Sequence, residues 1–384
     1  MKIITLLIVF LSGFALISCQ RTNEKNAQPD SDTKTASTKA EPKVIHQGSV
    51  ELLNKMELKG IRSIAIASEI NSLLVSDGTI IDEQAVDLEV FSLSNLKRTA
   101  SFTITDAMSG DYPWSSKSLA VDRNGFHALL YNQYIELNSL HAKTVLDIQP
   151  VIGRKNVYPE PWSISPNGES ALVLIGSYWS QEESTLATFN LVNGKHLKKL
   201  ATGRNIEYGC ACFLDNETVV SISYDGVVTI HDLRNSTNKI FPKKITPGVI
   251  WKGTNLQLHP FDGGKKLVVT GEKEILVLDI KQQSVLFRHL CTNGNAILTN
   301  DNKLILWQNY QKMKPIKHPI RRGTVENVLF VADSQTGRIV GKYVLPTFYH
   351  MMIIDDNSEN IYAAHYDELH KIKIDLSPIT DSNK

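Results

Sequence analysis

The chain has 384 residues, with 41 Lys and Arg against 40 Asp and Glu. This neutral balance argues against nucleic acid, or a membrane surface held by charge alone, as the main partner. The length exceeds that of a usual single core, although all-β domains can run this long as one unit.

The first eighteen residues, "MKIITLLIVFLSGFALIS", hold one lysine and then an apolar run, which predicts a secretory signal peptide over residues 1–18. The run ends in "LISC", Leu16 to Cys19, which resembles the lipobox of bacterial lipoproteins. That resemblance implies cleavage before Cys19, lipid attachment to Cys19 and a membrane anchor. An ordinary cleaved signal and an uncleaved anchor helix are the alternatives. In each case most of the chain lies outside the cytoplasm.

Residues 19–48 hold no aromatic side chain and are rich in Lys, Asp, Glu, Thr, Ser and Ala. Such a segment cannot bury enough apolar surface to offset the entropy lost on ordering. We therefore expect a disordered tether over 19–48 and a folded domain over 49–384. Gln20 is not the Asp that retains lipoproteins in the inner membrane of some enteric bacteria, which favours the outer membrane, facing the periplasm.

Short apolar runs that end in a turn residue recur through the folded part. Their last residues are Ser68, Asp122, Pro166, Asp215, Pro260, Asn300 and Asp355. Consecutive runs therefore end roughly 40 to 55 residues apart, which is the period of a propeller blade. Each is followed by a Gly/Asn-rich turn and further apolar runs, up to four short strands per repeat. We find no convincing amphipathic helix between Ser49 and Pro378.

The two ends of this pattern complement each other. The last repeat has no fourth strand, whereas "SVELLNKMEL", residues 49–58, is an extra strand before the first repeat. Pairing the two would close the ring and remove an exposed sheet edge. The sequence therefore predicts an all-β, seven-bladed β-propeller closed by an N-terminal strand in the last blade.

Two stretches carry a family resemblance. "SYDGVVTIHDLRNS", residues 223–236, resembles the third strand of WD40 repeats, with His231-Asp232 where that family usually has Trp-Asp. "VADSQTGRIVG", residues 331–341, resembles the ending shared by YVTN-type and quinoprotein-type propellers. The Gly-His dipeptide of WD40 repeats is missing, so the subfamily stays open. The resemblance implies the fold and implies no activity.

Several polar positions are candidates for chemistry. His231 and Asp232 are neighbours in a strand, so they point to opposite faces and we expect no catalytic dyad. Cys210 or Cys212 could form a disulfide with Cys291, or all three could be small buried side chains.

Blade 7 and the channel mouth offer further candidates. His350, His365 and His370 lack a carboxylate set with metal-binding spacing, which favours ordinary packed histidines. Glu160 is the only acid near the expected ring of channel-mouth residues. That ring is Ser63, Lys117, Pro161, Cys210, Asn255, Asn295 and His350. The sequence therefore predicts no catalytic residue, no metal site and no cofactor.

The loops between second and third strands, and between blades, are longer than the remaining turns. They place aromatic residues on one rim, where side chains with an apolar body and a polar tip suit an interface. The insert at 308–324 adds basic residues that could meet an acidic partner or anionic head groups, or could form a solvated loop kept extended by prolines. The candidate binding residues are Tyr112, Trp114, Tyr158, Tyr178, Trp179, Lys314, Lys317, Arg321 and Arg322.

These observations predict a lipid-anchored cell-envelope propeller that acts as a non-catalytic protein-binding scaffold through its loop-rich face. Its expected partners are another envelope protein and the membrane, through the lipid on Cys19, with no nucleic acid. We expect a monomeric propeller within a complex. The alternative is a propeller enzyme or small-ligand binder that uses the central funnel, similar to lactonases or quinoproteins.

Overall fold

The structure is a computed structural model. The chain divides into two compact units, residues 1–43 and 44–384, and all the described residues belong to the second. The structure describes residues 46–58, 60–77, 85–105, 119–122, 125–130, 132–148, 151, 158–176, 184–203, 209–223, 225–245, 257–271, 273–291, 296–312, 325–365 and 367–381.

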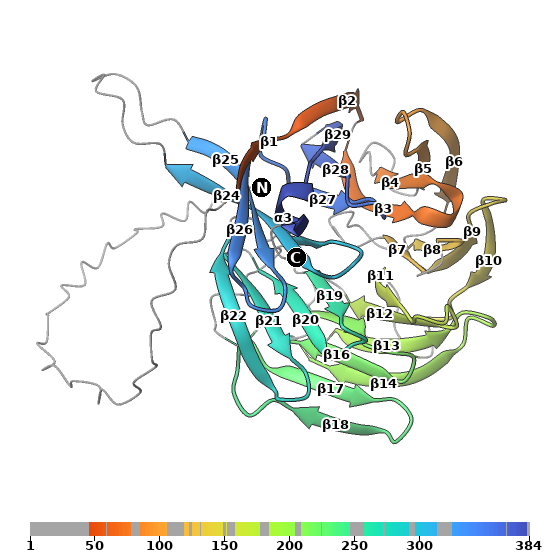
Figure 1. The fold of residues 1–384 in the computed structure, drawn as a ribbon. Helices are drawn as coiled ribbons and strands as arrows, with labels where there is room; N and C mark the ends of the chain where they lie inside the picture. The colour runs from red at the N-terminus through yellow and green to blue at the C-terminus, as the bar shows by residue number, and fades with distance from the viewer. Residues whose placement is uncertain are drawn as a thin grey trace, which may run out of the picture. The chain divides into compact units, whose positions relative to one another are not determined.

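The described residues form seven small sheets, which are the blades of a β-propeller (Figure 1). The strands of blades 1 to 4, from inner to outer, are β3 (Ile61–Ala67), β4 (Ser72–Asp77), β5 (Ala85–Ser92) and β6 (Arg98–Thr105); β7 (Leu119–Val121), β8 (His127–Leu130), β9 (Gln133–Glu136) and β10 (His141–Val145); β11 (Tyr158–Ile164), β12 (Ser170–Gly176), β13 (Thr185–Asn190) and β14 (His196–Thr202); and β15 (Cys210–Phe213), β16 (Thr218–Ile222), β17 (Val228–Asp232) and β18 (Thr237–Ile240).

Blades 5 to 7 follow the same order, with strands from both ends of the chain in the last two. They contain β19 (Gln257–Phe261), β20 (Lys266–Thr270), β21 (Glu274–Asp279) and β22 (Ser284–Leu290); β23 (Ala296–Leu298), β24 (Leu304–Lys312), β25 (Val325–Asp333), β26 (Ile339–Val344) and β1 (His46–Ser49); and β27 (Met351–Ile354), β28 (Asn360–His365), β29 (Glu368–Lys373) and β2 (Glu51–Glu57).

The inner strands form a closed ring, because each lies against the next and β27 lies against β3. Buried apolar residues gather between neighbouring sheets, and each of the seven clusters draws its members from two adjacent blades. Both sides of each sheet are therefore covered, as the near-continuous apolar runs of the second strands require. The predicted all-β, seven-bladed propeller is confirmed.

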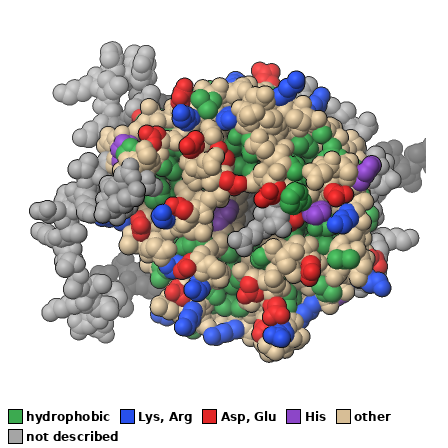
Figure 2. Space-filling model, turned by 45° about the vertical axis from the view of Figure 1, so that its right-hand side comes forward, with side chains coloured by type: hydrophobic (Ala, Val, Ile, Leu, Met, Phe, Trp, Pro, Cys, Tyr) green, Lys and Arg blue, Asp and Glu red, His purple; other side chains and the backbone are tan. Residues whose placement is uncertain are grey.

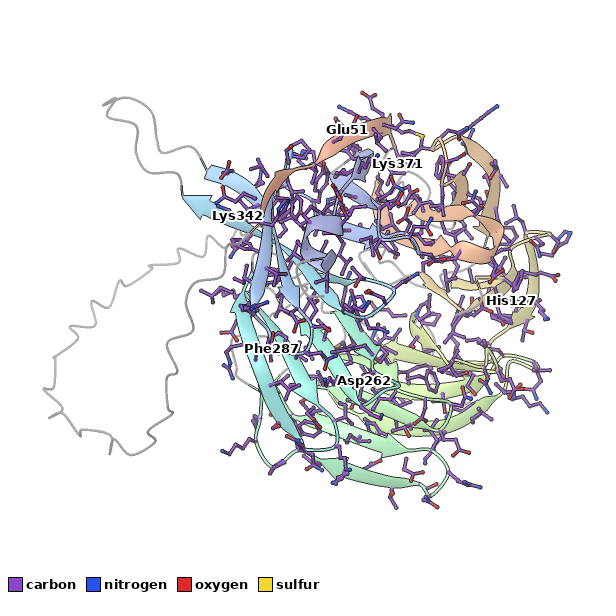
Figure 3. The ribbon with its side chains drawn as sticks, in the orientation of Figure 1. Glu51, His127, Asp262, Phe287, Lys342 and Lys371 are labelled. Atoms are coloured by element: carbon purple, nitrogen blue, oxygen red, sulfur yellow. The ribbon has the colours of Figure 1, made fainter. Side chains whose placement is uncertain are left out.

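The N-terminal clasp, residues 46–57, closes the ring at two blades. β2 pairs antiparallel with β29, from Glu51 opposite Lys373 to Glu57 opposite Glu368, as predicted (Figures 1 and 3). β1 was not predicted. It adds a fifth, parallel strand to blade 6, pairing with β26 along its whole length. The described strands thus begin before the boundary predicted at residue 49.

Blades 6 and 7 are joined by polar as well as apolar contacts. The fully buried Gln308 side chain donates to the backbone carbonyl of Tyr349 (3.2 Å) and accepts from its N–H (2.9 Å). The Tyr343 hydroxyl donates to the carbonyl of Asp375 (2.6 Å). The short helix α3 (Ser377–Asp381) buries Ile379 in the same seam. The C-terminal segment therefore locks the seam that the clasp spans.

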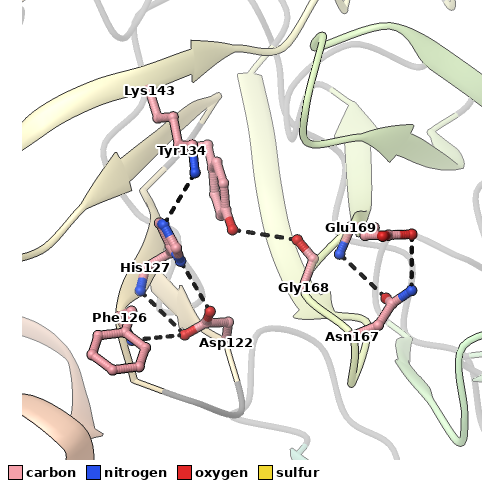
Figure 4. Close-up of polar contacts among 8 residues, drawn as sticks. All are labelled: Asp122, Phe126, His127, Tyr134, Lys143, Asn167, Gly168 and Glu169. Atoms are coloured by element: carbon pink, nitrogen blue, oxygen red, sulfur yellow. Dashed lines mark hydrogen bonds and ion pairs between the residues drawn. The ribbon is translucent and has the colours of Figure 1, made fainter.

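A side-chain oxygen at the end of the inner strand holds the following turn in four blades. In blade 2, Oδ1 of Asp122 accepts from the N–H groups of Phe126 (3.0 Å) and His127 (3.1 Å), and Oδ2 lies 3.1 Å from His127 Nδ1 (Figure 4). The equivalent bonds run from the N–H groups of Ser170, Leu304 and Asn360 to Ser165, Thr299 and Asp355. The repeat seen in the sequence is thus a repeat of turn hydrogen bonds.

Helices are short in the part of the chain that the structure describes. The 3-10 helix η1 (Ser68–Ile70) fills the first turn of blade 1, and α3 ends the described chain. Among the described residues, no helix is long and apolar enough to cross a membrane.

Candidate binding site at the loop end of the blades

The antiparallel strand order gives every blade two unlike ends. Turns from first to second and from third to fourth strand lie at one end, the short-turn end, with segments such as 122–126 and 165–169. Connections from second to third strand, and to the next blade, leave from the other, the loop end. They include the long segments 106–118, 241–256 and 313–324. The strand bounds therefore agree with the prediction that the longer connections lie at one end of the blades.

Most predicted binding residues lie outside the described residues. This holds for Tyr112, Trp114, Tyr178, Trp179, Lys314, Lys317, Arg321 and Arg322, for Lys117, Asn255 and Asn295 of the channel-mouth ring, and for the lipidation residue Cys19. Tyr158 is the first residue of β11, where it pairs with Gly176 at the loop end of blade 3. The binding role of these residues stays a prediction.

Two other aromatic residues of the predicted rim, Tyr349 and Trp162, seal the seams between blades. Tyr349 is fully buried between blades 6 and 7. Trp162 is partly buried against the apolar cluster between blades 3 and 4. These two rings are therefore packed between blades.

The sequence predicted that His231 and Asp232 form no dyad, and their side chains indeed have separate partners. His231 is buried, with Nε2 2.8 Å from Ser221 Oγ and Nδ1 3.0 Å from Asn238 Oδ1. Asp232 points away and accepts from the N–H of Asn235 (2.8 Å). Burial lowers the pKa of His231, so its ring is held neutral within the blade. Its position is structural.

The histidines of blade 7 are held by neighbours in the same blade. His370 places Nδ1 2.9 Å from the Tyr349 hydroxyl and Nε2 3.0 Å from a Glu368 oxygen. His365 Nδ1 lies 2.6 Å from the carbonyl of Phe348. Burial raises the pKa of Tyr349 well above its usual value, which keeps the hydroxyl protonated. Within the described residues, no group of three or more His, Cys, Asp or Glu side chains is arranged for a metal ion.

The three cysteines in the described part of the propeller are buried thiols without a disulfide. Cys291 donates a hydrogen bond to the carbonyl of Gly271 (3.1 Å). Burial raises the pKa of Cys212 well above its usual value, so that thiol is a poor nucleophile. The sequence left open a disulfide with Cys291 or three small buried side chains, and this structure has the buried side chains.

A cavity of about 560 Å³ opens at the short-turn end, beside the seam of blades 6 and 7. It is formed by two first-to-second-strand turns and the segment after β29, so sequence reasoning had no local signal for it. A hydrogen bond from Ser377 lowers the pKa of Asp375 in its wall. Its lining residues are Thr299, Asp301, Leu304, Asp356, Asn357, Ser358, Glu359, Lys373, Ile374, Asp375, Leu376 and Ser377.

The loop end of blade 3 carries two buried polar atoms without a hydrogen-bond partner among the described residues. They are Oε1 of Glu160, in β11, and Oγ of Ser184, which directly precedes β13. The other carboxylate oxygen of Glu160 accepts from the indole N–H of Trp162 at 3.3 Å. Buried polar atoms nearly always have a hydrogen-bond partner in folded proteins. Two such atoms without a partner at one end of one blade make this region a candidate binding site.

The surface carries charges of both signs side by side. Figure 2 shows acidic and basic side chains interspersed on the visible face, which agrees with the neutral composition. No protein-family model matches the chain, and no curated protein matches it as a relative. A function for this chain therefore has to be inferred from the geometry of its blades and the residues of its loops.

Proposed function

We propose that this protein is a lipid-anchored propeller of the cell envelope that binds another envelope protein through its loop end, without catalysis. The observation that carries the proposal is the unequal length of the connections at the two ends of the blades. Rigid scaffolds with long loops at one end commonly use those loops for binding.

The sequence of these loops supports a protein partner. Tyr178 and Trp179 follow Gly176, the last residue of β12, and the basic residues Lys314 to Arg322 of the insert follow β24. Tyr and Trp bury large areas at little entropic cost, and Arg pairs well with carboxylates, which makes them frequent centres of protein interfaces.

The face assignment is tested by co-purification from membranes with the full-length lipoprotein. Trp179→Ala should lower partner recovery at least about tenfold, the loss typical of an interface aromatic. Phe126→Ala is the matched control, because Phe126 is an exposed aromatic residue at the short-turn end. Equal recovery with both variants would contradict the proposed face.

The anchor is tested separately. Cys19→Ala should abolish incorporation of a radiolabelled fatty acid. Label incorporated into the variant would show that Cys19 is not the lipidated residue.

A further inference from the structure

The Glu160 carboxylate is buried, and only one of its two oxygens has a hydrogen-bond partner among the described residues. Glu160 is 2% exposed, and its Oε2 atom accepts one hydrogen bond from Trp162. Its Oε1 atom is covered and has no partner within the described part of the chain. A carboxylate oxygen that loses water without gaining a donor destabilises the fold, so a structure that retains one calls for an explanation.

Ser184 supplies a second orphan on the same side of the sheet. Its residue is fully buried, and no described residue bonds its Oγ atom. A Cβ atom placed on Gly176 would lie 2.2 Å from this Oγ, so the Ser184 hydroxyl occupies the space that a side chain at 176 would fill. The glycine thus leaves room for the hydroxyl over β12, the strand between β13 and β11.

The strand register places both side chains on the face of blade 3 that meets blade 4. Glu160 pairs with Leu174, which in turn pairs with Leu186, and paired residues in a sheet share a face. Both leucines belong to the apolar cluster that also contains Phe213 of blade 4. A donor arriving beside these leucines would meet a carboxylate in poorly solvated surroundings, where a charge-assisted hydrogen bond is strong.

We propose that Glu160 and Ser184 form an acceptor site for a lysine or arginine side chain of the partner protein, at the loop end of the seam between blades 3 and 4. This inference rests on the proposed function. The cationic nitrogen would donate to Glu160 Oε1, with the Ser184 hydroxyl as a second polar contact. The Trp162 indole beside the carboxylate is suited to a cation.

The chain's own cations are the competing occupants. Arg154 and Arg204 belong to the connections that precede β11 and β15 in the sequence, and both are outside the described residues. If one of them neutralised Glu160, the carboxylate would be a structural ion pair with no capacity for a ligand. Thermal unfolding of a Glu160 variant separates these cases.

The binding test uses purified full-length protein and peptide-like probes, N-acetyl-lysine methylamide and N-acetyl-arginine methylamide, with the neutral norleucine analogue as reference. Calorimetric titration should show that a cationic probe binds and the neutral one does not. Glu160→Gln should weaken binding at least about tenfold, as expected when one member of a desolvated charge pair is lost. Glu169→Gln, an exposed glutamate of the same blade, should bind like the parent.

Three results would overturn the proposal. The first is no binding of either cationic probe to the parent protein. The second is equal binding by the Glu160→Gln variant. The third is tighter binding of cadaverine, a free diamine, than of both peptide-like probes, which would assign the site to a small molecule.

Thermal unfolding gives an independent readout. Without ligand, Glu160→Gln should raise the melting temperature, because it removes an uncompensated buried carboxylate. A lower melting temperature would mean that the chain itself pairs Glu160, and would overturn the site. Partner recovery that depends on Trp179 but not on Glu160 would overturn this inference alone. Recovery that depends on neither would also overturn the proposed function.

Discussion

The seam between blades 6 and 7 and the seam between blades 3 and 4 solve the same packing problem differently. In the first, Gln308 bonds both backbone groups of Tyr349, and α3 and the clasp cover the apolar cluster. In the second, an apolar cluster of similar kind borders the orphan atoms of Glu160 and Ser184.

The difference follows from chain connectivity. Blades 3 and 4 are each built from four consecutive strands, so their seam can tolerate incomplete polar pairing without opening the ring. Blades 6 and 7 are also joined by the chain, through residues 345–350, but each is completed by a strand of the N-terminal clasp that pairs with it noncovalently, β1 with β26 and β2 with β29. We call the seam of blades 6 and 7 the closing seam and the seam of blades 3 and 4 the inner seam. We expect mutations at the closing seam to lower the free energy of unfolding more than mutations at the inner seam.

Removal of the clasp should have the largest effect. A chain that begins at Leu58 would lose β1 and β2 and expose the outer edges of β26 and β29. We expect a loss of more than about 4 kcal/mol in the free energy of unfolding, measured by urea denaturation. A chain that begins at Val44 keeps the clasp and should unfold like the full chain. Equal stability of the two truncations would show that the clasp does not close the ring.

Ile379→Ala should come next. Ile379 is 1% exposed in the closing seam, and truncation of a buried isoleucine costs about 2–5 kcal/mol. Val192→Ala, at a residue that is 75% exposed, is the control and should change little. A cost below about 1 kcal/mol would mean that α3 does not hold the seam.

Gln308→Ala should follow, at about 2–3 kcal/mol, because it removes two buried hydrogen bonds between the Gln308 side chain and the backbone of Tyr349. Gln282→Ala, in an exposed turn of blade 5, serves as the reference in the same urea titration. If both variants unfold at the same urea concentration, the paired amide contributes nothing to closure.

Ser184→Ala should have the opposite sign at the inner seam. It removes a buried hydroxyl that lacks a hydrogen bond to any described residue, so we expect no loss, or a gain of up to about 1 kcal/mol. Thr299→Ala is the contrasting variant. Thr299 Oγ1 accepts a hydrogen bond from the N–H of Leu304, so its removal should lower the free energy of unfolding. A loss above about 1 kcal/mol for Ser184→Ala would reveal a partner for the hydroxyl.

The smallest effect should be a pH dependence at the inner seam. Burial lowers the pKa of His231 in the folded state below 6.5, its ordinary value. The unfolded chain therefore binds the proton more readily, so stability is complete above pH 6.5 and falls as the pH drops toward the folded pKa. His231→Gln should show a smaller decline in melting temperature between pH 7 and pH 5. Parallel declines would contradict a buried neutral ring.

The sequence predicted the blades well because each blade repeats the same local chemistry. The predicted run ends at Asp122 and Asp355 are the residues whose carboxylates hold the turns. In blades 3 and 6, Ser165 and Thr299 do this one position before the predicted Pro166 and Asn300. Their shorter hydroxyl side chains gave a weaker signal than a carboxylate does.

Features that depend on distant segments could not be predicted. β1 is four residues of mixed polarity, and its pairing is set by β26, almost three hundred positions away. Glu160 was noticed as an acid near the channel, but its orphan oxygen follows from the register of blade 3 and the packing of blade 4. The cavity at the short-turn end combines three segments in the same way.

The pairing of β2 with β29 also governs how the ring is assembled. Glu51 is synthesised before its partner Lys373 and before all the other blades, so β2 must wait while those blades form. Contacts of such long sequence separation slow folding, and a waiting strand edge is open to wrong partners. We expect ring closure to be the last and slowest folding step, and the nascent chain to depend on chaperones until it is complete.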